Sequence, residues 1–344
     1  MSKATIDDVA ELAGVSIKTV SRVVNQEPNV RDSTRAKVEE AISRLNYRPN
    51  LSARNLAKQR SYLIGLIYDD PSAYEIPSAG YVISMQLGAL KACRTADYEL
   101  LIHPCNYRSR NIGPELKALI EHARPVGIVL AAPLSNMPRI VDAIEATGTP
   151  FVRLSPGTAT VSQPTVVTND REISAEMTRY LASLGHKRIA FIKGHTSHKA
   201  VSNRYIGYLD GLKQSGLPFS SDLIEQGDNS FDSGEAAGTR LLQRAQRPTA
   251  IFAANDDMAA GVIRAADLLG VSVPGEVSVA GCDDISLARQ ICPTLTTIRQ
   301  PLAAMAERAA MMLISSAREG VVPQAKEVVP ATLRIRESTG PAPG

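Results

Sequence analysis

Residues 5–25 read TIDDVAELAGVSIKTVSRVVN, and this stretch decides what the N-terminal domain can be. Thr5 can accept hydrogen bonds from the unpaired N–H groups that begin a helix, which predicts a helix over Ile6–Ala13. Gly14 can adopt the left-handed conformation that ends such a helix. A second helix is predicted at Ile17–Val24. Two helices joined by about three residues that include a glycine have the spacing of a helix-turn-helix.

The second predicted helix has two different sides, and Ser16 is a good N-cap for it. At about 100° per residue, the apolar side holds Val20, Val23 and Val24. The opposite side holds Lys18, Ser21 and Arg22, with Ile17 beside them. Cations, a hydroxyl and one apolar group can contact guanine edges, phosphates and thymine methyls in a major groove. An amphipathic surface helix without a DNA partner would show the same pattern.

A third helix, predicted at Ser33–Asn46, would complete a small core. Its apolar residues recur at helical spacing and are Val38, Ala41, Ile42 and Leu45. Residues 1–60 hold 11 Lys and Arg against 7 Asp and Glu, whereas the remaining residues hold 27 against 28. The positive charge is therefore concentrated in the segment that contains the helix-turn-helix pattern. This distribution suits phosphate binding, although an ordinary basic surface would also explain it.

Beyond Tyr62, short apolar runs alternate with helical patterns. The predicted strands are Leu63–Tyr68, Gly127–Ala132, Arg188–Ile192, Ala250–Ala254 and Val277–Gly281, and predicted helices include Tyr81–Ala96, Ile173–Leu184 and Met258–Leu269. This order predicts an α/β fold with mostly parallel sheets. The segment is too long for a single comfortable core, so two lobes are expected. Ligands of such folds bind at the carboxyl ends of strands, which would meet in a cleft between the lobes.

Several classes of protein are disfavoured by the sequence. No apolar run is long enough for a membrane helix, and the acidic start MSKATIDDVAELAG is unlike a secretory signal, so a globular cytoplasmic protein is expected. The cysteines have no C-x-x-C pairing and are interpreted as reduced packing residues: Cys93, Cys105, Cys282 and Cys292.

The sequence lacks the enzyme motifs G-x-S-x-G, P-loop, G-x-G-x-x-G and H-E-x-x-H. His195 and His198 lack an evident third ligand and are interpreted as satisfied or exposed histidines, so no metal and no cofactor are expected.

The residues 5–25, followed by NYRPNLSARNLA, resemble the DNA-binding headpiece and hinge of the lactose-repressor/galactose-repressor (LacI/GalR) family of bacterial regulators. The stretches LGHKRIAFI, NRYIGYLDGL, AIFAANDDMAAG, VPGEVSVAGCDD and LTTIRQP are similar in order and spacing to the sensor core of that family. The resemblance covers essentially the whole chain. It implies a helix-turn-helix headpiece at 1–49, a hinge helix and linker at 50–61, and a two-lobed periplasmic-binding-protein-like core at 62–340. The expected N-lobe is 62–163 with 292–322, and the expected C-lobe is 164–291 with 323–340.

The resemblance also implies which residues contact DNA. In the family, a short hinge helix inserts a leucine into the minor groove at the centre of a palindromic site, and the matching leucine is Leu56. The matching segment, Asn50–Lys58, has nine residues, which are too few for a stable isolated helix, but two such segments on kinked DNA could order each other. A plain linker is the alternative. The expected DNA contacts are Thr5, Ser16, Ile17, Lys18, Thr19, Ser21, Arg22, Asn25, Ala53, Arg54, Leu56 and Ala57.

For the sensor core, the resemblance implies an effector site formed by Asp70, Arg204, Asn255 and Asp283. A guanidinium and carboxylates can bind the adjacent hydroxyls of a sugar, because each hydroxyl both donates and accepts. A strand-end carboxylate that caps a turn would also explain Asp283, and a surface salt bridge would explain Arg204. Two positions depart from the family, since Asn229 and Cys282 stand where aromatic residues are usual. The residues that could stack on a sugar instead are Tyr68, Tyr74, Tyr81 and Phe231.

Together these features predict a homodimeric DNA-binding transcription regulator. It is expected to repress sugar or glycoside utilisation genes, and its binding to the operator is expected to respond to a small polar effector. Its partners would be palindromic double-stranded DNA and a sugar. The rival interpretation is a plain sugar-binding protein of the periplasmic type. The attached helix-turn-helix argues against this rival. The effector, the operator and the sign of the response stay open at this stage.

Overall fold

The computed structural model describes residues 4–24, 29–47, 61–69, 80–157, 163–323 and 325–344. It divides into two compact units, Met1–Ser61 and Tyr62–Gly344. The predicted Asn25, the hinge residues Ala53, Arg54, Leu56 and Ala57, and Asp70 and Tyr74 lie outside the described residues.

The N-terminal unit is helical, and its helices are α1 (Ile6–Ala13), α2 (Ile17–Val24) and α3 (Asp32–Leu45). The α1 and α2 bounds are those predicted, and α3 begins and ends one residue earlier than predicted. Thr5 and Asp8 form a reciprocal capping box at the start of α1. Gly14 ends α1 with φ 62°, a backbone conformation that favours glycine. The buried core of this unit consists of Val9, Ala10, Val20, Val23, Val38 and Ala41.

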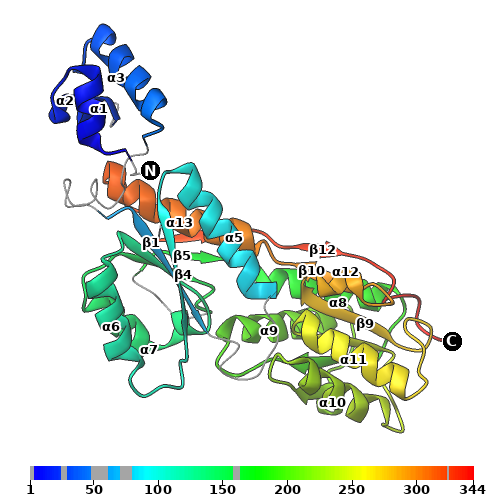
Figure 1. Ribbon diagram of the computed structural model, residues 1–344. Helices are drawn as coiled ribbons and strands as arrows, with labels where there is room; N and C mark the ends of the chain where they lie inside the picture. Colours follow the sequence, from blue (N-terminus) through cyan, green and yellow to red (C-terminus); the bar gives the residue numbers. More distant parts are fainter. Residues whose placement is uncertain (1–3, 25–28, 48–60, 70–79, 158–162, 324) are drawn as a thin grey trace. The chain divides into compact units, whose positions relative to one another are not determined.

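The second unit contains two six-stranded sheets within the described residues, one in each lobe (Figure 1). The N-lobe sheet has the order β11-β5-β4-β3-β1-β2, and all of its pairs are parallel. Its strands are β1 (Leu63–Asp69), β2 (Glu99–Cys105), β3 (Gly127–Leu130), β4 (Phe151–Leu154), β5 (Thr165–Val167) and β11 (Lys326–Val328). The helices of this lobe are α5 (Gly80–Thr95), α6 (Ile112–Ala123), α7 (Pro138–Glu145) and α13 (Leu302–Glu319).

The C-lobe sheet has the order β12-β10-β9-β8-β6-β7 and is parallel except where β12 joins β10. Its strands are β6 (Ile189–Lys193), β7 (Ile224–Gln226), β8 (Ala250–Ala253), β9 (Ser278–Asp283), β10 (Thr296–Arg299) and β12 (Thr332–Arg334). Its helices are α8 (Asp170–Ser183), α9 (Lys199–Gln214), α10 (Phe231–Leu242), α11 (Asp256–Leu268) and the short α12 (Leu287–Gln290). The strands β6, β8 and β9 are almost fully buried, as expected of a sheet flanked by helices.

The chain passes between the lobes three times within the described residues, and each passage lies a few residues later than the approximate boundary predicted. The prediction put β5 and β11 in the C-lobe and β10 in the N-lobe, whereas β5 and β11 complete the N-lobe sheet and β10 lies inside the C-lobe sheet. These strands have only three or four residues. Their membership of a sheet depends on the strand they pair with, which an apolar pattern in the sequence does not reveal.

Candidate functional site

The exposed side of α2 carries the residues that the sequence singled out for DNA contact. Ile17 is 49% exposed, Lys18 and Arg22 are exposed, and Ser21 is half-buried. The opposite side is buried in the core of the unit through Val20. An exposed isoleucine beside two cations gains nothing in water, but it can contact a thymine methyl in a groove.

Three of the other predicted DNA contacts also have local structural roles. The Thr5 side chain takes part in the α1 capping box with Asp8, and hydrogen bonds from Thr5 lower the pKa of that carboxyl. The Ser16 Oγ accepts a hydrogen bond from the Thr19 backbone N–H at 3.2 Å and lies 2.9 Å from the Thr19 Oγ1. These side chains therefore shape the ends of the two helices, whatever else they contact.

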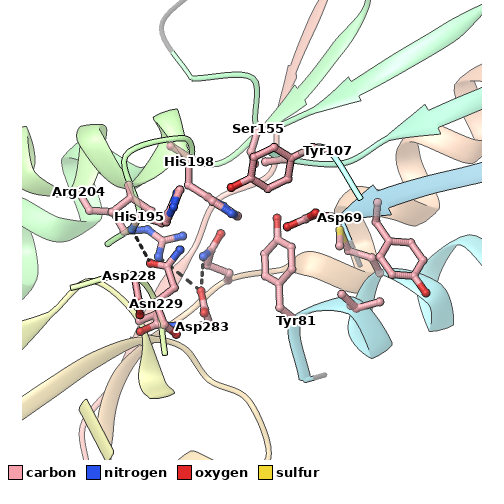
Figure 2. A pocket seen from close by; sticks show the side chains of 18 of the residues that line it. Asp69, Tyr81, Tyr107, Ser155, His195, His198, Arg204, Asp228, Asn229 and Asp283 are labelled. Atoms are coloured by element: carbon pink, nitrogen blue, oxygen red, sulfur yellow. Dashed lines mark hydrogen bonds and ion pairs between the residues drawn. The ribbon is translucent and has the colours of Figure 1, made fainter. Parts of the chain in front are cut away.

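In the second unit, a cavity collects side chains from both lobes (Figure 2). Tyr81 and Tyr107 of the N-lobe face Arg204, His195 and Asp283 of the C-lobe across it. The lining residues within the described part of the chain are Tyr68, Asp69, Tyr81, Val82, Met85, Tyr107, Arg108, Ala132, Ser155, His195, His198, Ala200, Val201, Arg204, Asp228, Asn229, Asn255, Asp283 and Gln300. Many of these residues follow directly after strands, as the strand-end rule predicts for parallel sheets.

Arg204 on α9 is the centre of the polar network. Its Nε donates to Asp170 Oδ1 at 3.0 Å, and its Nη1 donates to the Ala254 carbonyl and lies 3.6 Å from Asp283 Oδ1. The side chains of all three charged residues are less than a tenth exposed. The alternative that Arg204 makes a surface salt bridge is therefore wrong, because this ion pair is buried. The partners of the guanidinium replace the water that it loses on burial.

Asp283 lies at the end of β9 with φ 130°, a region that L-residues rarely occupy. Its Oδ1 accepts a hydrogen bond from the Gln300 amide, and burial raises the pKa of its carboxyl to about 7. A second buried acid, Asp256, accepts hydrogen bonds from Thr297 and from the Ile285 N–H. Burial, reinforced by Asp283, also raises the pKa of Asp256. The site therefore holds carboxyl groups that are difficult to ionise without a polar ligand.

Asn255 and Asn229 form a second polar group on the C-lobe wall. The Asn255 Oδ1 accepts the Met258 N–H as the N-cap of α11, and its Nδ2 donates to the Asn229 carbonyl at 2.9 Å. Asn229 has φ 75°, and its Oδ1 accepts the His195 N–H at 3.2 Å. This hydrogen bond holds the Asn229 side chain at the cavity wall, at the position where the family resemblance leads one to expect an aromatic ring.

Comparison with known proteins gives one consistent result. Residues 5–50 match the model of the bacterial regulatory proteins of the lacI family, and residues 178–339 match a periplasmic binding protein-like domain. The transcriptional regulator GalR of Salmonella typhimurium strain SL1344 is 34% identical over 97% of this chain and 96% of its own length. The chain belongs to the lacI family.

Solved structures agree with this assignment. The lac repressor dimer bound to operator and the anti-inducer ONPF matches with a TM-score of 0.82 and 26% identity, over 98% of this chain and 100% of that one. A complex of the transcriptional regulator CelR with cellobiose matches with a TM-score of 0.73 and 28% identity, over 97% of this chain and 99% of that one. As a lacI-family member, the chain is a DNA-binding transcription regulator rather than an enzyme, which confirms the prediction.

Within this lacI-family core, the structure brings Arg204, Asn255 and Asp283 together at one cavity. Tyr68 and Tyr81 also line it, whereas Phe231 begins α10 and is not among the lining residues. The residues that sequence reasoning missed are Asp69, Tyr107, Arg108, Ser155, Asp228 and Gln300 at the wall, and Asp170 behind Arg204. Gln300 lies within the quoted stretch LTTIRQP, which was a usable signal.

Two smaller interpretations need correction. His195 and His198 both line the cavity, so describing them only as satisfied or exposed histidines was incomplete. Cys93, Cys105 and Cys282 are buried as expected of packing residues, but Cys292 is exposed.

In the part of the chain that the structure describes, no helix is long and apolar enough to cross a membrane. The same residues include no group of three or more potential metal ligands.

Proposed function

We propose that this lacI-family regulator is a cytoplasmic homodimeric repressor of sugar or glycoside utilisation genes, and that a sugar in the cavity controls its binding to a palindromic operator. The observation that carries the proposal is the convergence of Arg204, Asn255 and Asp283 on one cavity in a chain that has a DNA-binding headpiece. A guanidinium, an amide and a carboxylate offer both donors and acceptors to vicinal hydroxyls. The headpiece argues against the rival, a plain sugar-binding protein.

On the DNA side, we propose that Ile17, Lys18 and Arg22 contact base edges and phosphates in the major groove. Their exposure on one side of α2 supports this role. The hinge contribution of Leu56 rests on the family resemblance alone. Two headpieces on one dimer would bind two half-sites, because a single small headpiece covers too few base pairs for a long site.

The relatives support a sugar as the effector, since the CelR structure contains cellobiose. The sign of the response in this chain is a separate question that binding data would answer. We propose release from the operator when the sugar binds, because a repressor of utilisation genes has to leave its operator when the sugar is present, and a sugar that prefers the arrangement of the lobes that does not bind DNA would shift the population toward it.

Selection from a randomised duplex pool with the full-length protein provides the operator for the test. Sugars are screened by thermal shift, and the operator affinity is then measured by fluorescence anisotropy with and without each sugar that binds. The expected result is a palindromic site whose affinity falls at least about tenfold in the presence of one sugar. A protein that binds sugar but selects no DNA sequence would contradict the proposal and favour the plain sugar-binding protein.

A further inference from the structure

Among the lining residues that the structure describes, acidic side chains outnumber basic ones. Asp69, Asp228 and Asp283 are the acids, against the two guanidinium groups of Arg108 and Arg204. Two further buried acids, Asp170 and Asp256, lie directly behind the wall. The sign of this balance bears on which effectors the cavity can accept.

The most central cation is already engaged. Arg204 donates to Asp170 at 3.0 Å and to the Ala254 carbonyl, and it lies 3.6 Å from Asp283. Its charge is therefore balanced by two buried carboxyl groups before any ligand enters. A ligand anion would have to compete with these partners for the guanidinium.

The other basic groups offer little compensation. Burial, His195 and Arg204 lower the pKa of His198, so this imidazole is neutral at physiological pH. The Nδ1 of His195 lies 2.6 Å from the Ser197 Oγ, which occupies that ring nitrogen. Lys193 is not among the lining residues, and its Nζ lies 4.0 Å from the centre of the Tyr205 ring. Arg108 is charged but exposed at the cavity wall, 5.7 Å from the centre of the Tyr107 ring, so water and salt weaken its attraction for a ligand anion.

The remaining lining suits a neutral polyol. Carboxylates accept hydrogen bonds from hydroxyls, and the Asn255 and Gln300 side chains add amide groups. The rings of Tyr81 and Tyr107 lie on the N-lobe side, opposite Arg204, Asp228 and Asp283 of the C-lobe (Figure 2). They offer apolar area to the C–H face of a sugar ring, in place of the aromatic residue absent at Asn229.

We infer that the effector is an uncharged sugar, and that the cavity discriminates against the same sugar carrying a carboxylate or a phosphate. The inference rests on the proposed sugar-sensing function and narrows its ligand class. The physical reason is repulsion. An added negative charge near the buried Asp283 would disfavour the ionised form of that carboxyl further, where screening by water and salt is weak, and near the exposed Asp228 it would meet a like charge that solvent partly screens.

Matched ligands test this inference on the full-length protein by isothermal titration calorimetry. The sets are galactose, galacturonate and galactose 6-phosphate, the same three forms of glucose, and cellobiose with its 6-phosphate. In the set that binds most tightly, the neutral sugar is expected to bind more than tenfold tighter than its acidic forms. Equal or tighter binding of a uronate or phosphate would overturn the inference while leaving sugar sensing intact. Binding of none of these ligands would count against sugar sensing itself, and the inference would fall with it.

A charge variant separates repulsion from shape. Asp228→Asn removes one carboxylate from the wall, and it should reduce the preference for the neutral sugar over its uronate by at least threefold. The matched control is Asp232→Asn, an exposed acid in the first turn of α10 that does not line the cavity. The control should leave the preference unchanged. An unchanged preference in Asp228→Asn would overturn the electrostatic explanation.

Discussion

Asp283→Asn should stabilise the protein without ligand and, at the same time, weaken effector binding. Burial raises the pKa of the Asp283 carboxyl from its ordinary value of 3.8 to about 7. A group whose pKa is raised in the folded state destabilises that state when it is ionised. This cost is fully present above the folded pKa and is lost as the pH falls toward the unfolded value.

The magnitude follows from the two pKa values. A change from 3.8 to about 7 corresponds to a ceiling of about 4 kcal/mol at pH 8. The asparagine Oδ1 can take the place of the Asp283 Oδ1 near Gln300 and Arg204, but its NH2 group then replaces Oδ2, and a buried N–H left without an acceptor there costs about 2 kcal/mol. The expected net gain is therefore about 2 kcal/mol, or about 3 °C in Tm for a chain of this size. At pH 5 the ceiling falls to about 2 kcal/mol, because the carboxyl is then protonated in the folded state but still ionised in the unfolded state, and the asparagine cost cancels this remainder, so the net gain should disappear.

Scanning calorimetry of the DNA-free protein at pH 8 and pH 5 measures the effect. Asp228→Asn is a matched control from the same cavity. Burial raises the pKa of Asp228, but hydrogen bonds from Ser230 outweigh that effect and hold it below the ordinary value, so this variant should gain no stability. An Asp283→Asn protein that is no more stable than wild type at pH 8, or that gains equally at both pH values, would refute the reasoning.

Three further predictions concern other parts of the molecule. In anisotropy titrations, Arg22→Ala should lose about 1–3 kcal/mol of binding free energy on the selected operator and much less on random DNA. The control Arg44→Ala, which changes an exposed residue on α3, should alter neither of these two affinities. Equal losses of Arg22→Ala on both DNAs would indicate a phosphate contact instead. Gly88→Ala should destabilise the protein by about 1–3 kcal/mol in denaturant titrations, because a Cβ there would lie 1.9 Å from the Ala303 carbonyl oxygen. Gly113→Ala, whose Cβ would make an ordinary 3.6 Å contact, is the matched control and should cost nothing; equal losses in the two variants would count against the packing argument. Sedimentation should show a dimer at micromolar concentration, and a stable monomer would contradict the proposed assembly.

Local chemistry made the helices of the headpiece predictable. The capping residue Thr5 and the left-handed Gly14 determine where α1 begins and ends, and both signals act within a few residues. The apolar strands of the core were equally visible, because β6, β8 and β9 are buried along almost their whole length. The sheet to which the short strands β5, β10 and β11 belong was not predictable, since pairing partners far apart in sequence decide it.

The candidate effector site was predictable only in part. Arg204, Asn255 and Asp283 came from the family resemblance, and all three line the cavity. Asp170 escaped notice because an acid in the first turn of a helix is usually interpreted as favourable to the helix dipole. Its pairing with Arg204 requires α8 and α9 to pack side by side, which is a tertiary fact. Tyr68 and Tyr81 of the N-lobe were stacking candidates that the sequence could not place, and Tyr107 was missed.

We propose that sugar binding in the cavity and operator binding by the headpiece oppose each other through one conformational equilibrium. Operator titrations by fluorescence anisotropy, with and without a saturating concentration of the sugar that binds, test it most directly in wild type and Asp283→Ala. The account predicts that the sugar weakens operator binding of the wild type at least about tenfold, which requires about 1.4 kcal/mol of coupling. Asp283→Ala should bind the operator as well as wild type does and show no response to the sugar. A wild-type protein that binds sugar with unchanged operator affinity, or an Asp283→Ala protein that keeps the full response, would contradict the account.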